Sequence, residues 1–122
     1  MNAAVRLLIA DDDPVMRMLL GAIVRGDPAL ELVAEAGDAY EAIALAGEHR
    51  PDVVLLDIEM PGGGGLRAAR EIRALLPGAR ILGLSAHSDD AARQEMAVAG
   101  ADGYVVKGTP PGDVARVLRG DG

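Results

Sequence analysis

The chain alternates between short apolar runs and longer segments with helical spacing, and this alternation restricts the folds it can form. Five apolar runs are bounded by Asp, Gly or Ser, at residues 5–10, 30–34, 53–56, 81–84 and 104–106. Continuous apolar runs of this length are typical of parallel strands that are buried on both faces. Strands that alternate with helices predict a doubly wound α/β fold, in which helices cover both faces of a five-stranded parallel sheet.

Five helices are predicted between and after these runs. The first begins at Asp13-Pro14, an N-cap followed by Pro at the first helical position, and Gly26 can end it. The others are expected at about 39–49, at about 66–76, from about 88–90 to residue 100, and after residue 109. The glycines at 62–65 are predicted to form a loop. The second run is more polar than the others, which favours a position near the edge of the sheet.

Composition excludes several functions. The 122 residues fit one domain, and the chain is interpreted as a single domain over 1–122. The absence of Cys excludes disulfides, thiolate metal sites and a cysteine nucleophile. A net charge of -7 argues against direct nucleic-acid binding by this segment, because phosphate contacts need Lys and Arg. No apolar run approaches the roughly 18 residues of a membrane span.

Chemically useful side chains follow four of the five runs. Asp11 and Asp12 follow the first run, Asp57 the third, Ser85 the fourth and Lys107 the fifth. In a doubly wound sheet, the carboxyl ends of the strands meet at one edge, where ligands bind. We therefore expect these side chains to converge at one edge of the sheet.

This combination fits phosphoryl chemistry. Grouped carboxylates repel one another, and a hard cation such as Mg²⁺ relieves that repulsion. A carboxylate beside the cation can attack phosphorus, and a lysine and a hydroxyl can bind phosphoryl oxygens. Each residue alone also has an ordinary interpretation as a cap, turn residue or surface charge. The hypothesis depends on the combination.

Four segments in this order resemble the receiver domain of bacterial two-component response regulators: residues 7–14, 53–62, 81–87 and 100–108. The resemblance extends from about residue 6 to residue 118. It implies a flavodoxin-like fold with strand order 2-1-3-4-5, and a cytoplasmic protein.

The resemblance also implies roles for individual residues. Asp57 would be the phosphoacceptor. Asp11, Asp12 and Asp57 would bind Mg²⁺ or Mn²⁺, with Asp12 a direct ligand and Glu59 contributing its backbone carbonyl.

Further residues would respond to the phosphoryl group. Ser85 and Lys107 would bind its oxygens, and Tyr104 would be the aromatic residue that changes rotamer. His87, together with Glu59, would modulate dephosphorylation, although an ordinary loop imidazole is an equally good interpretation of His87.

The family's partners are a sensor histidine kinase and an output effector domain or protein. The segment 107–111, with Gly rather than Pro after the lysine, is similar to receivers that precede DNA-binding domains, so a transcription regulator is the favoured output. Homodimerisation through the fourth and fifth helices is a further possibility. The chain is not expected to be an enzyme beyond assisting its own phosphotransfer and autodephosphorylation.

Two alternatives are left open by the sequence. A phosphatase of the haloacid-dehalogenase type could use residues 11–13 as its nucleophile motif, but only isolated acidic residues follow Lys107 and Asp57 has no role. A pseudo-receiver would keep the fold as an interaction module without phosphorylation.

Overall fold

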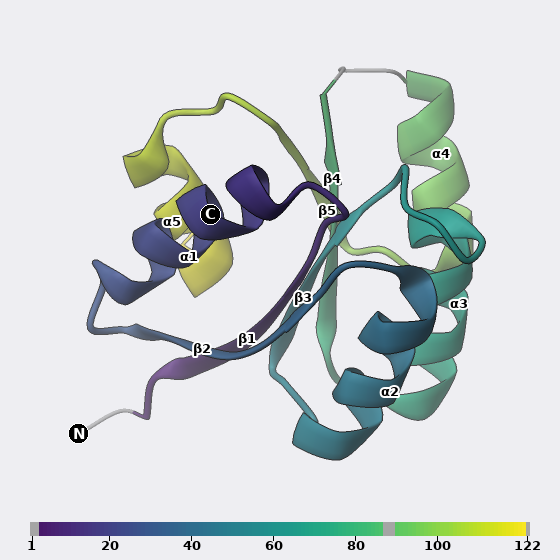
Figure 1. Cartoon of the computed structure of the whole chain (residues 1–122), viewed down its shortest axis with the longest axis horizontal. Coiled ribbons are helices and arrows are strands. Elements are labelled where there is room, and N and C mark those ends of the chain that lie inside the picture. The colour runs from purple at the N-terminus through teal and green to yellow at the C-terminus, as the bar shows by residue number, and fades with distance from the viewer. Residues whose placement is uncertain (1–2, 87–89, 122) are drawn as a thin grey trace.

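The computed structural model describes residues 3–86 and 90–121, and its strands form one parallel sheet in the order β2-β1-β3-β4-β5 (Figure 1). The strands are β1 (Val5–Ala10), β2 (Leu30–Ala36), β3 (Val53–Asp57), β4 (Arg80–Ser85) and β5 (Gly103–Val106). The helices are α1 (Pro14–Arg25), α2 (Ala39–His49), α3 (Gly64–Leu75), α4 (Asp90–Ala99) and α5 (Pro111–Arg119). The predicted doubly wound fold, its strand order and the edge position of the second strand are confirmed.

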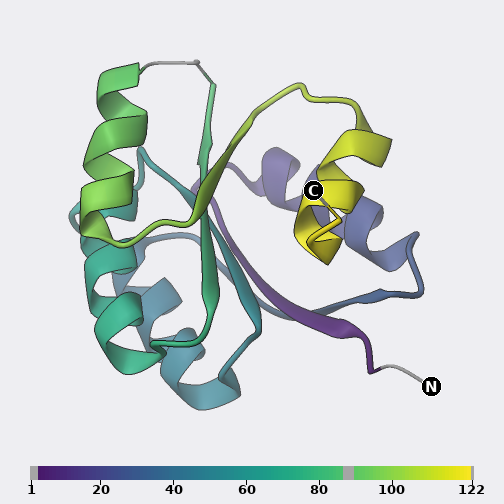
Figure 2. The same cartoon turned by 180° about the vertical axis from the view of Figure 1, so that it is seen from behind.

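Helices cover both faces of the sheet. α1 and α5 pack on one face, and α2, α3 and α4 pack on the other (Figures 1 and 2). Successive residues of a strand point to opposite faces. In β1, Leu8 and Ala10 therefore join the core under α2–α4, whereas Leu7 and Ile9 join the core under α1 and α5. Burial on both faces explains why the strands read as continuous apolar runs.

Side-chain caps begin the first two helices. The Asp13 carboxylate accepts a hydrogen bond from the backbone N–H of Val15 at 2.9 Å, as the sequence predicts. At the start of α2, the carboxylate of Asp38 accepts from the N–H of Glu41 at 2.8 Å. The Glu41 carboxylate in turn accepts from the N–H of Gly37 at 2.8 Å. Such reciprocal bonds satisfy N–H groups that the helix itself leaves unpaired.

The prediction that residues 62–65 form a loop is wrong for Gly64 and Gly65, which are the first residues of α3. A Cβ at Gly65 would lie 2.7 Å from the carbonyl oxygen of Asp57, and one at Gly64 would lie 2.6 Å from that of Ile58. The N–H of Gly65 also donates to the Ile58 carbonyl at 2.9 Å. These glycines let the helix approach the chain directly after β3 more closely than any side chain would allow.

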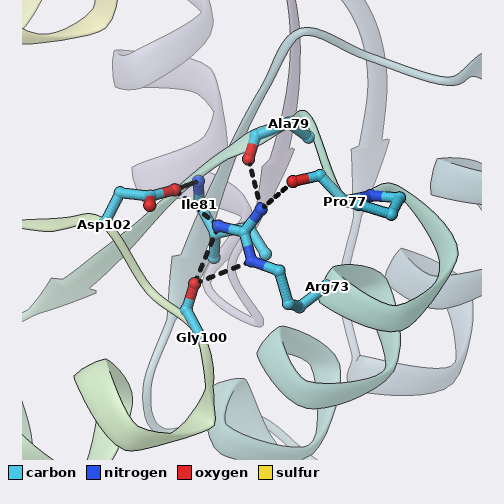
Figure 3. A network of polar contacts seen from close by, with 6 residues as sticks. All are labelled: Arg73, Pro77, Ala79, Ile81, Gly100 and Asp102. Atoms are coloured by element: carbon cyan, nitrogen blue, oxygen red, sulfur yellow. Dashed lines mark hydrogen bonds and ion pairs between the residues drawn. The ribbon is translucent and has the colours of Figure 1, made fainter.

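At the amino edge of the sheet, Arg73 of α3 binds two connections at once (Figure 3). Its guanidinium donates to the Pro77 and Ala79 carbonyls at 2.9 and 2.7 Å, between α3 and β4. It also donates to the Gly100 carbonyl at 2.8 Å and pairs with the Asp102 carboxylate at 2.5 Å, between α4 and β5. One side chain thus fixes the C-terminal end of α4 relative to α3.

Arg80, the first residue of β4, acts similarly on α5. Its guanidinium donates to the carbonyls of Val117 and Leu118 at 2.6 and 3.2 Å. These carbonyls belong to the last turn of α5, where the helix leaves carbonyls without their usual partner four residues on; the Val117 carbonyl also accepts from the N–H of Gly120 at 3.0 Å. These bonds join the start of an inner strand of the sheet to the end of α5, on the face opposite α3 (Figure 1).

Because of the close approach at Gly65, replacing glycine by alanine should change the free energy of unfolding in opposite directions at Gly65 and at Gly112. We expect Gly65→Ala to lower the free energy of unfolding by about 2–3 kcal/mol, because the new methyl group meets backbone atoms. Gly112→Ala in α5 meets nothing within 4 Å, so we expect a gain of up to about 0.5 kcal/mol. Urea denaturation of both variants checks this, and equal stabilities would contradict the role assigned to the close approach.

Candidate functional site

Four polar side chains lie at the carboxyl ends of adjacent strands. Asp57 ends β3 and Ser85 ends β4, while Asp11 and Lys107 directly follow β1 and β5. The strand pairings place Asp57 opposite Leu84, and the N–H of Lys107 donates to the Ser85 carbonyl at 2.7 Å. The backbone ladder therefore brings residues that are distant in the chain to one edge, as the apolar runs predict.

Three carboxylates form a compact group. Asp11, Asp12 and Asp57 each offer an oxygen, and these oxygens lie within 4.8 Å of one another. Asp11 and Asp57 are buried, whereas Asp12 is exposed to solvent. Asp13 is not part of it, because its carboxylate caps α1.

Lys107 is the cation of this site. Its Nζ lies 2.9 Å from Oδ2 of Asp11 and 3.3 Å from Oδ2 of Asp57. Burial tends to lower the pKa of Lys107, but its hydrogen bond to Asp11 and the two carboxylate charges raise the pKa above its usual value. The lysine is therefore fully charged at neutral pH.

Asp57 is the most perturbed carboxyl group of the site. Burial, followed by the charge of Asp11, raises the pKa of Asp57 from 3.8 to about 6. The N–H of Glu59, which donates to Asp57 Oδ1 at 3.2 Å, and the charge of Lys107 oppose this shift. Without a further cation, the group resists full ionisation.

The carboxylate group fits a hard divalent cation. Within the part of the chain that the structure describes, the buried Oδ2 of Asp11 contacts the Lys107 ammonium at 2.9 Å. A carboxylate oxygen can accept from more than one partner, so this oxygen can contact a metal ion as well as the lysine. Carboxylate oxygens from two or three residues, with room for water at exposed Asp12, are what Mg²⁺ and Mn²⁺ favour.

Arg17, on α1, supports the site and was not predicted from the sequence. Its guanidinium donates to the backbone carbonyl of Asp11 at 2.6 Å. It also lies 4.0 Å from the carboxylate of Glu35 on β2. No local pattern marks this residue, because its partners are set by how α1 packs against the sheet.

Three other residues that were predicted to take part are not seen in the carboxylate group of the described residues. The Glu59 side chain is exposed and lies outside the carboxylate group, although its backbone N–H contacts Asp57. Tyr104 is half-buried on β5, and its ring lies under the guanidinium of Arg93 from α4. His87 lies outside the described residues.

The sequence of residues 7–119 matches the family described as response regulator receiver domain. The chain therefore belongs to the family of two-component response regulator receiver domains. This agrees with the fold, with the acidic group and with the resemblance noted in the sequence.

Individual relatives support this assignment. The chain is 36% identical over 115 residues to the DNA-binding transcriptional activator DevR/DosR of Mycobacterium tuberculosis, covering 94% of this chain and 53% of that protein. It superposes with a TM-score of 0.91, at 31% identity, on the signal receiver domain of the putative response regulator NarL from M. tuberculosis, covering 96% of this chain and 94% of that one. The chain thus spans about half the length of the curated transcription regulator.

A relative of a different kind shares a shorter stretch. A protein-glutamate methylesterase/protein-glutamine glutaminase of Agrobacterium fabrum is 47% identical over 77 residues, covering 63% of this chain and 22% of that protein. Part of this chain is therefore similar to part of a protein whose name describes an enzyme rather than a transcription activator. Within the described residues, no helix combines the length and apolar character that crossing a membrane requires.

The raised pKa of Asp57 predicts a pH-dependent stability difference between the wild type and Asp57→Asn in EDTA. A raised carboxyl pKa contributes stability that is fully present below about 3.8 and is lost as the pH rises through about 6. Asn does not ionise, so Asp57→Asn does not lose this stability as the pH rises. We expect the variant to be more stable than the wild type by about 1–3 kcal/mol at pH 7.5, and the difference to shrink towards pH 4.5.

Urea denaturation at several pH values measures this difference. Asp113→Asn, an exposed carboxylate on α5, is the control and should show a small difference at every pH. A constant advantage of Asp57→Asn from pH 4.5 to 7.5 would contradict the electrostatic explanation.

Proposed function

We propose that Asp57 accepts a phosphoryl group from the phosphohistidine of a sensor histidine kinase, in a reaction that requires Mg²⁺ or Mn²⁺. The observation that carries this proposal is the contact of buried Asp57 with Lys107, beside the carboxylates of Asp11 and Asp12. Lys107 bridges the carboxylates of Asp57 and Asp11, and the oxygens of Asp11, Asp12 and Asp57 lie close enough together to hold a divalent cation as well. This is the charge arrangement that phosphoryl transfer needs.

In the proposed step, a carboxylate oxygen of Asp57 attacks phosphorus, the phosphorus–nitrogen bond breaks, and the electron pair returns to the imidazole. The metal, when bound, neutralises charge on the transferring group. Asp11, Asp12, Asp57 and the backbone carbonyl of Glu59 would hold it. Lys107 and the hydroxyl of Ser85 bind phosphoryl oxygens, and Lys107 loses part of its contact with Asp11 as it does so.

The same contacts provide a switch. Phosphorylation adds about −1.5 to −2 charges and strong acceptor oxygens at Asp57. Ser85 and Lys107 gain bonds to these oxygens in one state only, and such differential contacts shift an equilibrium between conformations. Tyr104 then changes rotamer, and the face made by α4, β5 and α5 changes shape.

The altered face would act on an output domain or protein, with homodimerisation through α4 and α5 as one route. The likeness to a DNA-binding transcriptional activator supports a transcription regulator as the output. We also propose that residues 1–122 form one receiver domain that acts in the cytoplasm as a phosphoacceptor rather than an enzyme on a separate substrate. The mechanism of a haloacid-dehalogenase-type phosphatase would give no role to Asp57 or to its contacts, which argues against that alternative.

Chemical phosphorylation tests the central proposal. The wild type, treated with acetyl phosphate and Mg²⁺, should gain one phosphoryl group by intact-protein mass spectrometry, and Asp57→Asn should gain none. Asp52→Asn, an exposed carboxylate at the other edge of the sheet, should label as the wild type does. Full labelling of Asp57→Asn would overturn the assignment, and an unlabelled wild type would support the pseudo-receiver alternative.

Metal binding tests the acidic group separately. We expect Asp12→Asn to weaken Mg²⁺ binding by roughly tenfold, or about 1.4 kcal/mol, because one carboxylate ligand becomes neutral. Asp13→Asn is the matched control from the same triplet, since its carboxylate caps α1 and Asn also caps well. Titration calorimetry with MgCl₂ measures both, and equal losses would contradict the separation of Asp12 from Asp13.

A further inference from the structure

Tyr104 is in contact with an arginine to which the proposed function gives no role. The guanidinium carbon of Arg93, on α4, lies 4.5 Å from the centre of the Tyr104 ring, on β5. A guanidinium over the face of an aromatic ring is attracted by the ring's electron density. Within the described residues, the Arg93 guanidinium forms no ion pair, so the ring is its electrostatic partner there.

Strand β4 contacts the Tyr104 ring from a second side. Gly83 pairs with Tyr104 across β4 and β5. A Cβ at Gly83 would lie 3.3 Å from Cδ2 of the tyrosine, which is tighter than an ordinary contact. The missing side chain leaves room for the ring against the strand. A small residue on β4 and a cation on α4 thus both contact the ring.

The Tyr104 ring is not closely packed on every side. A cavity of about 170 Å³ adjoins the ring and is lined by Arg93, Ala97, Ala101, Asp102, Gly103 and Tyr104. The two alanines are too small to fill the space beside the tyrosine. The attraction of the Arg93 guanidinium is therefore one contact that favours this position of the ring.

We propose that Arg93 is a positioning residue that holds the Tyr104 ring in place in the unphosphorylated protein and so opposes the switch. This inference rests on the proposed function, in which Tyr104 leaves its position when Asp57 is modified. A contact that forms in just one of two conformations stabilises that conformation by the free energy of the contact. An exposed contact of this kind corresponds to about a two- to fivefold shift in the equilibrium.

Beryllofluoride with Mg²⁺, which imitates the phosphoryl group, measures this shift. We expect Arg93→Gln to bind beryllofluoride about two- to fivefold more tightly than the wild type by titration calorimetry, because the competing rotamer loses its support. The matched control is Arg67→Gln, since Arg67 makes the same contact with the other tyrosine, Tyr40, at 4.5 Å. The control should bind beryllofluoride with unchanged affinity.

Changes at the ring separate this role from a general structural one. In a Tyr104→Phe background, which keeps the ring face, Arg93→Gln should still tighten binding; in a Tyr104→Leu background its effect should vanish. Arg93→Lys keeps the charge and should fall between the wild type and Arg93→Gln. Unchanged or weaker binding by Arg93→Gln, or an effect that persists with Tyr104→Leu, would overturn the proposal. A wild type that does not bind beryllofluoride would instead refute the proposed function, and the inference with it.

Discussion

Two buried carboxylates and one lysine share a single edge of the sheet, and their electrostatics determine what the site can do. Asp11 and Asp57 repel one another in a place where water cannot screen them, and Lys107 compensates only part of that repulsion. The site is therefore locally unfavourable for folding. Such arrangements are concentrated at functional sites, because the same repulsion creates affinity for an incoming cation.

The rest of the fold supplies the rigidity that this arrangement needs. Asp57 is the last residue of a strand whose five residues are all buried, and neighbouring strands pair with it on both sides. Gly64 and Gly65 bring α3 against the backbone that follows. The acidic residue thus sits on an element that cannot easily move away from the lysine.

Much of this could be predicted from the sequence, because backbone pairing makes the positions of strand ends nearly independent of side-chain detail. Continuous apolar runs predict buried parallel strands, and the residues after them predict the site at Asp11, Asp57, Ser85 and Lys107. The runs mark strand ends less well: β2 continues two residues beyond its apolar run to Ala36, because ladder hydrogen bonds do not depend on side-chain polarity.

The remaining features depend on close approach or on long side chains. The sequence reveals that residues 62–65 tolerate unusual backbone angles, but not that two of them face the carbonyls of Asp57 and Ile58. Arg73 and Gly100 are 27 residues apart, and Arg80 and Leu118 are 38 apart. An arginine that reaches a distant carbonyl looks, in the sequence, like any surface charge.

The arginine network at the amino edge has a mechanical consequence. Arg73 attaches the chain after α4 to α3 and to the start of β4, at the end of the helix farthest from Ser85. A helix that is attached at one end tilts when its other end is displaced. A small displacement near the carboxyl edge would therefore swing α4 about this pivot, and the amplitude would grow with distance from Gly100.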